Sequence, residues 1–159
     1  MSNKKFIKTT VVINMLICSI IIILSKFYWI GYIPSESMSQ TLEVGQRVIC
    51  DKTVDEYNRQ DIIVFEFEEE NVTSLYVKRI IGLPGDVIEI KFGAVFVNGG
   101  TIDEGYLAEG TITNDKGTDT YVVPEGCVFV LGDNRCNSID SRNYGFIDID
   151  DIQGKVIYY

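Results

Sequence analysis

The sequence predicts a mainly β protein in which one N-terminal transmembrane helix is followed by a twisted antiparallel β-sheet or barrel. Three observations carry this prediction. Residues 9–25 contain no charged side chain, short segments after residue 30 alternate apolar and polar residues, and glycine-containing turn signals separate those segments. At 159 residues the chain is long enough for one such domain and too short for two.

The uncharged stretch at the N-terminus has the composition of a membrane span. Its centre, Ile20–Leu24, is strongly apolar, and Lys26 can extend to the lipid headgroups. The aromatic cluster Phe27–Trp29 is typical of a membrane interface. We therefore predict a span over residues 8–29, at the short end of what crosses a bilayer.

Three other interpretations of this stretch fit less well. A cleaved secretory signal needs small residues before its cleavage site, and residues 25–29 offer no such pair. An interfacial helix needs a polar face, and a buried core helix is disfavoured because the stretch is apolar on all faces. We predict that residues 1–30 form a cytoplasmic N-terminus and membrane anchor, and that residues 31–159 form an extracytoplasmic β-rich domain.

The charge distribution supports this orientation and excludes one class of partner. Lys4, Lys5 and Lys8 precede the apolar stretch, and basic residues favour the cytoplasmic side of a membrane. From residue 31 onward there are 10 basic and 23 acidic residues, a net charge of −13. Nucleic-acid binding needs a basic surface, so no nucleic-acid partner is expected.

The predicted strands follow one another with short turns between them. In residues 87–92, Ile88, Ile90 and Phe92 share one face while Glu89 and Lys91 share the other, which predicts a half-buried strand. Gly93 and residues 98–100 mark hairpin turns on either side of a further strand. The other predicted strands are residues 61–67, 74–81, 94–97, 121–123, 127–131 and 155–159.

The four cysteines leave little room for a disulfide framework or a metal site. Cys18 lies in the predicted span, and at most one bridge can form among Cys50, Cys127 and Cys136. Cys127 and Cys136 are closest in sequence, so a bridge between them stays open, although free thiols are the favoured state. The chain has no histidine and no CxxC motif, so neither a metal nor another cofactor is expected.

Ser37 and Lys78 are the candidate catalytic residues. Because the chain has no histidine, a hydrolytic serine here would need another base, and a lysine that has lost its proton by burial can serve. Tyr76, Lys78 and Ile80 share one strand face, which would desolvate the amine if that face points inward. Taken singly, each residue has a simpler interpretation: Lys78 as a solvated strand lysine, and Ser37 as a turn residue after Pro34.

A third segment, residues 132–145, follows a predicted strand and is rich in charged and amide side chains. Asp133 with Arg135, and Asp140 with Arg142, have the i, i+2 spacing that allows ion pairs to fix the shape of a loop. An ordinary surface loop is the alternative.

In this order, and behind one membrane span, these segments resemble the type I signal peptidases of bacteria, the membrane-anchored serine proteases that remove signal peptides. The resemblance covers nearly the whole chain, including residues 33–42, 61–65, 76–86, 97–107 and 123–145. It implies that Ser37 is the nucleophile and Lys78 the general base. It further implies that Ser35 contributes its hydroxyl to the oxyanion hole and that Ser138 orients the lysine amine. The resemblance also implies residues that brace the site, Arg79, Asp133, Asp140 and Arg142, and residues that line the substrate pockets, Ile33, Met38, Leu42, Tyr76 and Val77.

The function that the resemblance implies is removal of signal peptides through an acyl-enzyme, with cleavage after small residues of the Ala-x-Ala type. The implied partners are signal peptides of secretory preproteins, the lipid bilayer and a secretion translocon. The implied location is the cell membrane, with a single pass and the peptidase domain outside.

Two residues depart from the family pattern. Gln40 replaces the proline usual in Ser-Met-x-Pro-Thr-Leu, and Cys136 replaces the aspartate usual after Gly-Asp-Asn-Arg. These departures keep two alternatives open: a specialised homologue that serves one secreted or pilus protein, and a non-catalytic homologue that acts in assembly. A self-cleaving Ser-Lys repressor would need a DNA-binding segment in place of the span.

Overall fold

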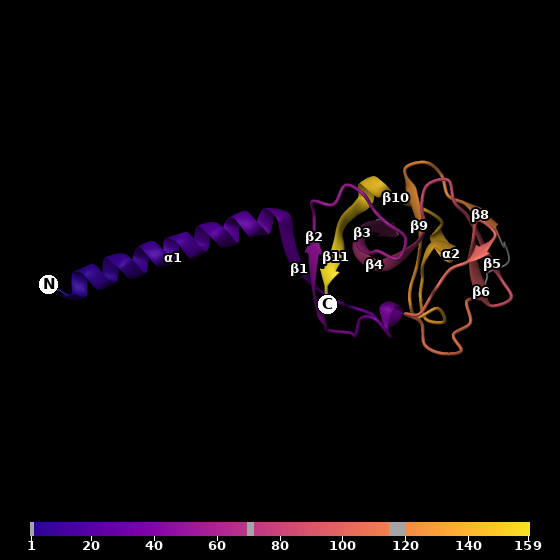
Figure 1. Ribbon diagram of the computed structural model, residues 1–159, viewed down its shortest axis with the longest axis horizontal. Helices are drawn as coiled ribbons and strands as arrows, with labels where there is room; N and C mark the ends of the chain where they lie inside the picture. The colour runs from indigo at the N-terminus through magenta and orange to yellow at the C-terminus, as the bar shows by residue number, and fades with distance from the viewer. Residues whose placement is uncertain (1, 70–71, 115–119) are drawn as a thin grey trace.

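The computed structural model describes residues 2–69, 72–114 and 120–159. One long N-terminal helix projects from a β-rich body (Figure 1). Within these described residues the body holds two antiparallel sheets, one of seven strands and one of four. The predicted fold class is confirmed, because a transmembrane-type helix is followed by a mainly β domain.

The helix α1 (Ser2–Phe27) contains a stretch, Phe6–Phe27, that is long and apolar enough to cross a membrane. None of its most apolar window is buried against the body, so the alternative of a soluble core helix is wrong. The expected end of the span is corrected from residue 29 to Phe27. Tyr28 begins strand β1 instead, because residues 28–32 pair with β2 and Trp29 packs against a core cluster.

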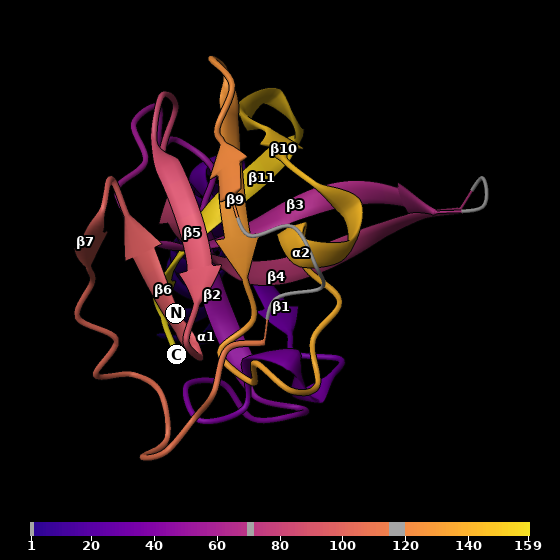
Figure 2. The same cartoon turned by 90° about the vertical axis from the view of Figure 1, so that its right-hand side faces the viewer.

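The larger sheet carries the catalytic candidates and has the strand order β1-β2-β11-β3-β4-β9-β10. Its strands, in that order, are Tyr28–Tyr32, Arg47–Asp51, Ile152–Tyr158, Ile62–Glu69, Val72–Gly82, Cys127–Leu131 and Ile147–Asp148. The ribbon formed by β3 and β4 extends well beyond the rest of the body (Figure 2).

The smaller sheet has the order β7-β6-β5-β8. Its strands are Gly100–Thr101, Ala94–Val97, Val87–Lys91 and Thr120–Val122. Ile88 and Ile90 are fully buried, as predicted, but Phe92 is 95% exposed. Phe92 has a φ of 54°, so it lies in the turn after β5 and does not continue the inward face.

In the part of the chain that the structure describes, three buried apolar clusters hold the body together. The first lies among β1, β2 and β3 and contains Met38 and Leu42 of the segment after β1. The second lies between the smaller sheet and strands β4 and β9, and the third covers the opposite face of β4. Short helices complete the chain: η1 (Glu36–Met38), α2 (Ser141–Tyr144) and η2 (Ile149–Asp151).

Candidate active site

Ser37 and Lys78 meet although 41 residues separate them. The amine Nζ of Lys78 donates to Ser37 Oγ over 2.7 Å and to the carbonyl of Val77 over 2.9 Å. Lys78 lies on β4 between Tyr76 and Ile80, which both pack in the third core cluster, and it is only 3% exposed. The alternative of a solvated strand lysine is therefore wrong.

Burial changes the acid–base behaviour of this lysine. Desolvation disfavours the charged ammonium and lowers the pKa of Lys78 to about 8, while the carboxylates of Asp140 and Asp133 oppose that change. A strand lysine held in this way is partly deprotonated near neutral pH. It can then accept a proton from the hydroxyl that it contacts.

Ser37 occupies the middle of η1, a single turn fixed by its neighbours in the sequence. Met38, at the end of η1, is 1% exposed, and Leu42 is fully buried in the first core cluster. The N–H of Ser39 closes the turn onto the carbonyl of Glu36. Because the core anchors this segment just after Ser37, the serine side chain is presented at the edge of β4. Ser35 Oγ lies 3.4 Å from Ser37 Oγ.

The loop after β9 fixes the nucleophile segment from the other side. The N–H of Asn134 donates to the carbonyl of Ser37 over 3.0 Å, and Asn134 Nδ2 donates to the carbonyl of Glu36. Ser138 Oγ is buried beside Gly132. Burial opposes ionisation of the Asp140 carboxyl, but Ser138 lies close enough to that group to help lower its pKa. The predicted role of Ser138 in orienting Lys78 stays a prediction.

The predicted bracing residues form two buried ion pairs, of which only Asp140 with Arg142 has the expected i, i+2 spacing. The expected pair of Asp133 with Arg135 is wrong, because Asp133 binds Arg79 and Arg135 binds Glu104. Arg79 binds Asp133 through two nitrogens, at 2.9 and 2.6 Å, and Asp133 also accepts from Thr41 over 2.5 Å. Arg142 binds Asp140 in the same two-pronged way, at 2.8 Å for each contact. The first pair ties β4 to the loop after β9, and the second begins helix α2, for which Asp140 is the N-terminal cap.

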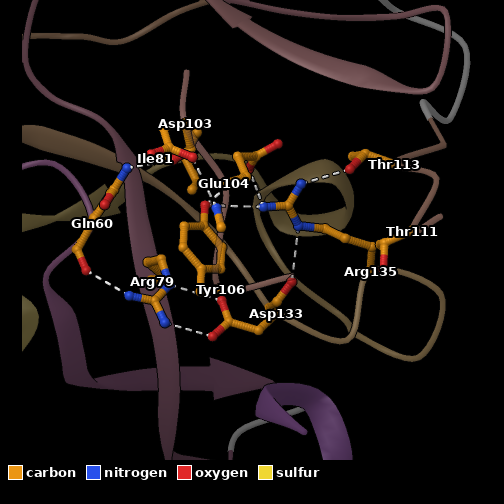
Figure 3. A network of polar contacts seen from close by, with 12 residues as sticks. Gln60, Arg79, Ile81, Asp103, Glu104, Tyr106, Thr111, Thr113, Asp133 and Arg135 are labelled. Carbon is orange, nitrogen blue, oxygen red and sulfur yellow. Dashed lines mark hydrogen bonds and ion pairs between the residues drawn. The ribbon is translucent and has the colours of Figure 1, made fainter. Parts of the chain in front are cut away.

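A second set of contacts, made by Tyr106, Glu104 and Arg135, supports the Arg79–Asp133 pair and was not predicted from the sequence (Figure 3). The ring of Tyr106 lies 4.0 Å from the guanidinium of Arg79. Arg135 is 3% exposed and bonds to Glu104, to Thr113 and to the carbonyl of Gly132. The segment Glu104–Leu107 was part of the family resemblance, but no role followed from it because Glu104 and Arg135 lie 31 residues apart in sequence.

A groove of about 610 Å³ opens over the dyad. Four of the five predicted pocket residues line it: Ile33, Met38, Tyr76 and Val77. Leu42 lies elsewhere, in the first core cluster, because its side chain points away from the groove and anchors the segment after η1. The groove also includes Glu36, Ser74, Leu75, Cys136, Asn137, Ser138 and Ile139. Cys127 and Cys136 are free thiols, which settles the open question of a bridge between them.

Gln40 has a φ of 95°, in the half of conformational space that proline cannot enter. We expect Gln40→Pro to lower the free energy of unfolding by about 2 kcal/mol or more, because proline fixes φ near −65° and the loop after Ser37 would have to move. Thermal unfolding measures this loss. Gln40→Gly is the matched control, since glycine accepts a positive φ, and equal melting temperatures for the two variants would contradict the expectation.

The groove, the buried lysine and the β scaffold together are those of a peptidase behind a membrane-type helix. The family model for signal peptidase, peptidase S26, matches residues 4–159. The chain therefore belongs to the signal peptidase family S26.

Individual relatives agree with this assignment. The chain is 43% identical over 148 residues to a signal peptidase I of Bacillus caldolyticus, covering 84% of this chain and 80% of the relative. It is 36% identical over 176 aligned positions to signal peptidase I U of Bacillus subtilis (strain 168), and the match covers 100% of this chain and 91% of that relative. A crystal structure of a signal peptidase I from Enterococcus faecalis V583 superposes with a TM-score of 0.53 at 33% identity, covering 65% of this chain and 98% of that one.

Proposed function

We propose that this chain removes signal peptides from exported preproteins with Ser37 as nucleophile and Lys78 as general base. The observation that carries the proposal is the 2.7 Å contact between Lys78 Nζ and Ser37 Oγ in a site where the lysine is almost fully buried. Family membership supports the proposed substrate class, and this geometry supports the proposed mechanism.

The proposed reaction passes through an acyl-enzyme. Ser37 Oγ forms a bond to the scissile carbonyl carbon while its proton moves to Lys78 Nζ. The oxyanion is held by the N–H of Ser37 and the hydroxyl of Ser35, and the C–N bond then breaks as Lys78 returns its proton to the leaving amine. Water then attacks the acyl carbon as Lys78 takes its proton, the bond from that carbon to Ser37 Oγ breaks, and Lys78 returns the proton to Ser37 Oγ. Ser138 is proposed to orient the lysine amine.

The walls of the groove are partly apolar. Ile33, Met38, Tyr76 and Val77 line it and offer apolar surface to a bound peptide. Together with membership of the signal peptidase family, this lining supports the proposal of cleavage after residues of the Ala-x-Ala type.

The membrane helix gives the proposal its location. Strand β1 begins at the residue after α1. The N–H of Lys52, the residue after β2, donates to the carbonyl of Phe27 at the end of α1. The body is thus held directly at the end of the helix. We propose that residues 1–30 anchor the chain with the N-terminus in the cytoplasm, and that residues 31–159 act outside, where the translocon delivers preproteins.

The test is cleavage of a purified preprotein by the full chain in detergent, with the cut position determined by mass spectrometry. The proposal requires one cut, after a small residue at the end of the signal peptide. Broad cleavage of unrelated precursors would exclude the specialised homologue. No cleavage of any precursor would favour the non-catalytic homologue and overturn the proposal.

The lowered pKa of Lys78 sets the pH dependence of the reaction. Because the pKa of Lys78 is lowered to about 8, the fraction of the amine that is free to act as a base falls as the pH drops below that value, and most of the amine is free above it. We expect kcat/KM to rise about tenfold for each pH unit below that value and to level off above it. A profile that is flat from pH 6 to 9 would contradict this assignment of the base.

A further inference from the structure

We propose that the carboxylate of Glu36 makes the groove select against precursors with acidic residues next to the cleavage site and in favour of basic ones. This inference rests on the proposed function and adds a charge preference to it. Glu36 directly precedes the nucleophile in η1, its side chain is exposed, and it lines the groove.

The charges along the groove point to this preference. Of the described residues that line it, only Glu36 and Lys78 have ionisable carboxylate, ammonium or guanidinium groups. Lys78 must be neutral to act as a base, so the charge that remains in the working groove is the negative charge of Glu36. A substrate carboxylate close to Ser37 would be repelled by it, and a substrate ammonium attracted.

Contacts with the loop after β9 hold Glu36 in place. Asn137 Nδ2 donates to Glu36 Oε2 over 3.3 Å, and Asn134 Nδ2 donates to the Glu36 carbonyl over 3.1 Å. The carboxylate is therefore held against Asn137, which also lines the groove. Because a glutamine side-chain oxygen can accept the same bond from Asn137, Glu36→Gln removes the charge and keeps the contact.

A second carboxylate, that of Glu69, contacts a residue of the groove without lining the groove itself. The hydroxyl of Tyr76, which lines the groove, donates to Glu69 over 3.3 Å. The groove thus has acidic groups near both η1 and the ribbon of β3 and β4, and no described basic side chain except Lys78 lines it.

The experiment compares matched precursor peptides with an Ala-x-Ala cleavage signal. Each peptide carries Lys, Gln or Glu at one position, either −2, +1 or +2 relative to the cut, and kcat/KM is measured with the full chain in detergent. For the native chain we expect kcat/KM for the Lys peptide to exceed that for the Glu peptide by about fivefold or more at one of these positions. In 1 M salt this ratio should fall toward one.

Three variants decide whether Glu36 is responsible. Glu36→Gln should reduce the Lys-to-Glu ratio at least threefold, and Glu36→Lys should reverse the preference, a result that a purely structural role would not produce. Glu125→Gln, at an exposed position in the turn after β8, is the matched control and should keep the native ratio. Ratios that are equal for all four proteins would overturn the inference.

The outcomes separate this inference from the proposed function. Cleavage of the Gln peptides with no charge preference would leave the peptidase function intact and remove the role of Glu36. Failure to cleave any of the peptides would remove both.

Discussion

Ser37→Ala and Lys78→Met should each reduce signal-peptide cleavage by about a thousandfold or more, because each removes one half of a pair that acts as a unit. Alanine at 37 leaves no oxygen to attack the carbonyl. Methionine at 78 has nearly the length of lysine but no group that can accept the proton of Ser37. Initial rates on one preprotein measure the loss, and the double variant should be no slower than either single one.

The folded state provides a separate check on the Lys78→Met variant. Lys78 is 3% exposed and burial lowers its pKa, so keeping its charged ammonium in the folded state costs free energy. Methionine fills the same volume without that cost, and we expect the melting temperature to be equal or higher. A Lys78→Met variant that is inactive and also melts at a lower temperature than the native chain would not support a catalytic role.

Ser39→Ala and Lys91→Ala are the matched controls for these variants. Ser39 follows η1 and contributes a backbone bond to it, and Lys91 pairs with Glu89 in the smaller sheet. Neither side chain lines the groove. Both variants should keep the native rate, and a similar loss in either would contradict the assignment of the dyad.

The sequence could mark Ser37 and Lys78 as candidates but could not pair them by local pattern. With no histidine in the chain, a base for Ser37 had to come from another residue type, and the alternation of β4 placed Lys78 on the face shared by Tyr76 and Ile80. The pairing of the two residues across 41 positions came from the family resemblance. The strand at residues 127–131 was predicted with its observed bounds, since a short apolar run between turns leaves few alternatives.

Other features depended on contacts that no local pattern shows. Residues 27–30 are equally suited to a membrane interface and to a β-strand, and only pairing with β2 decides that β1 begins at Tyr28. The bond between Arg135 and Glu104 joins two loops, so the sequence around either residue does not indicate its partner. The positive φ of Gln40 was not foreseeable either, because the family pattern has proline there and proline excludes it.

The substitution Gly132→Ala should damage both the fold and the activity, although glycine and alanine differ by one methyl group. A Cβ at this position would lie 2.5 Å from the carbonyl oxygen of Ser37 and 2.2 Å from Ser138 Oγ. One of these neighbours is backbone of the nucleophile segment, so it cannot rotate away. We expect a loss of about 2–3 kcal/mol in the free energy of unfolding, typical of an overpacked core.

The same methyl group should also act on catalysis, because it pushes on the segment that positions the nucleophile. Gly132 donates its N–H to Asp140 and accepts from Arg135, so the loop is fixed on its other side and the displacement falls on Ser37. A shift of that size should lower kcat about a hundredfold at temperatures where the variant is folded. Gly100→Ala is the control, since a Cβ there would meet its nearest described neighbour at 3.7 Å. If Gly132→Ala and Gly100→Ala had the same melting temperature and the same kcat, the close packing of Gly132 against Ser37 and Ser138 would have no part in holding the site.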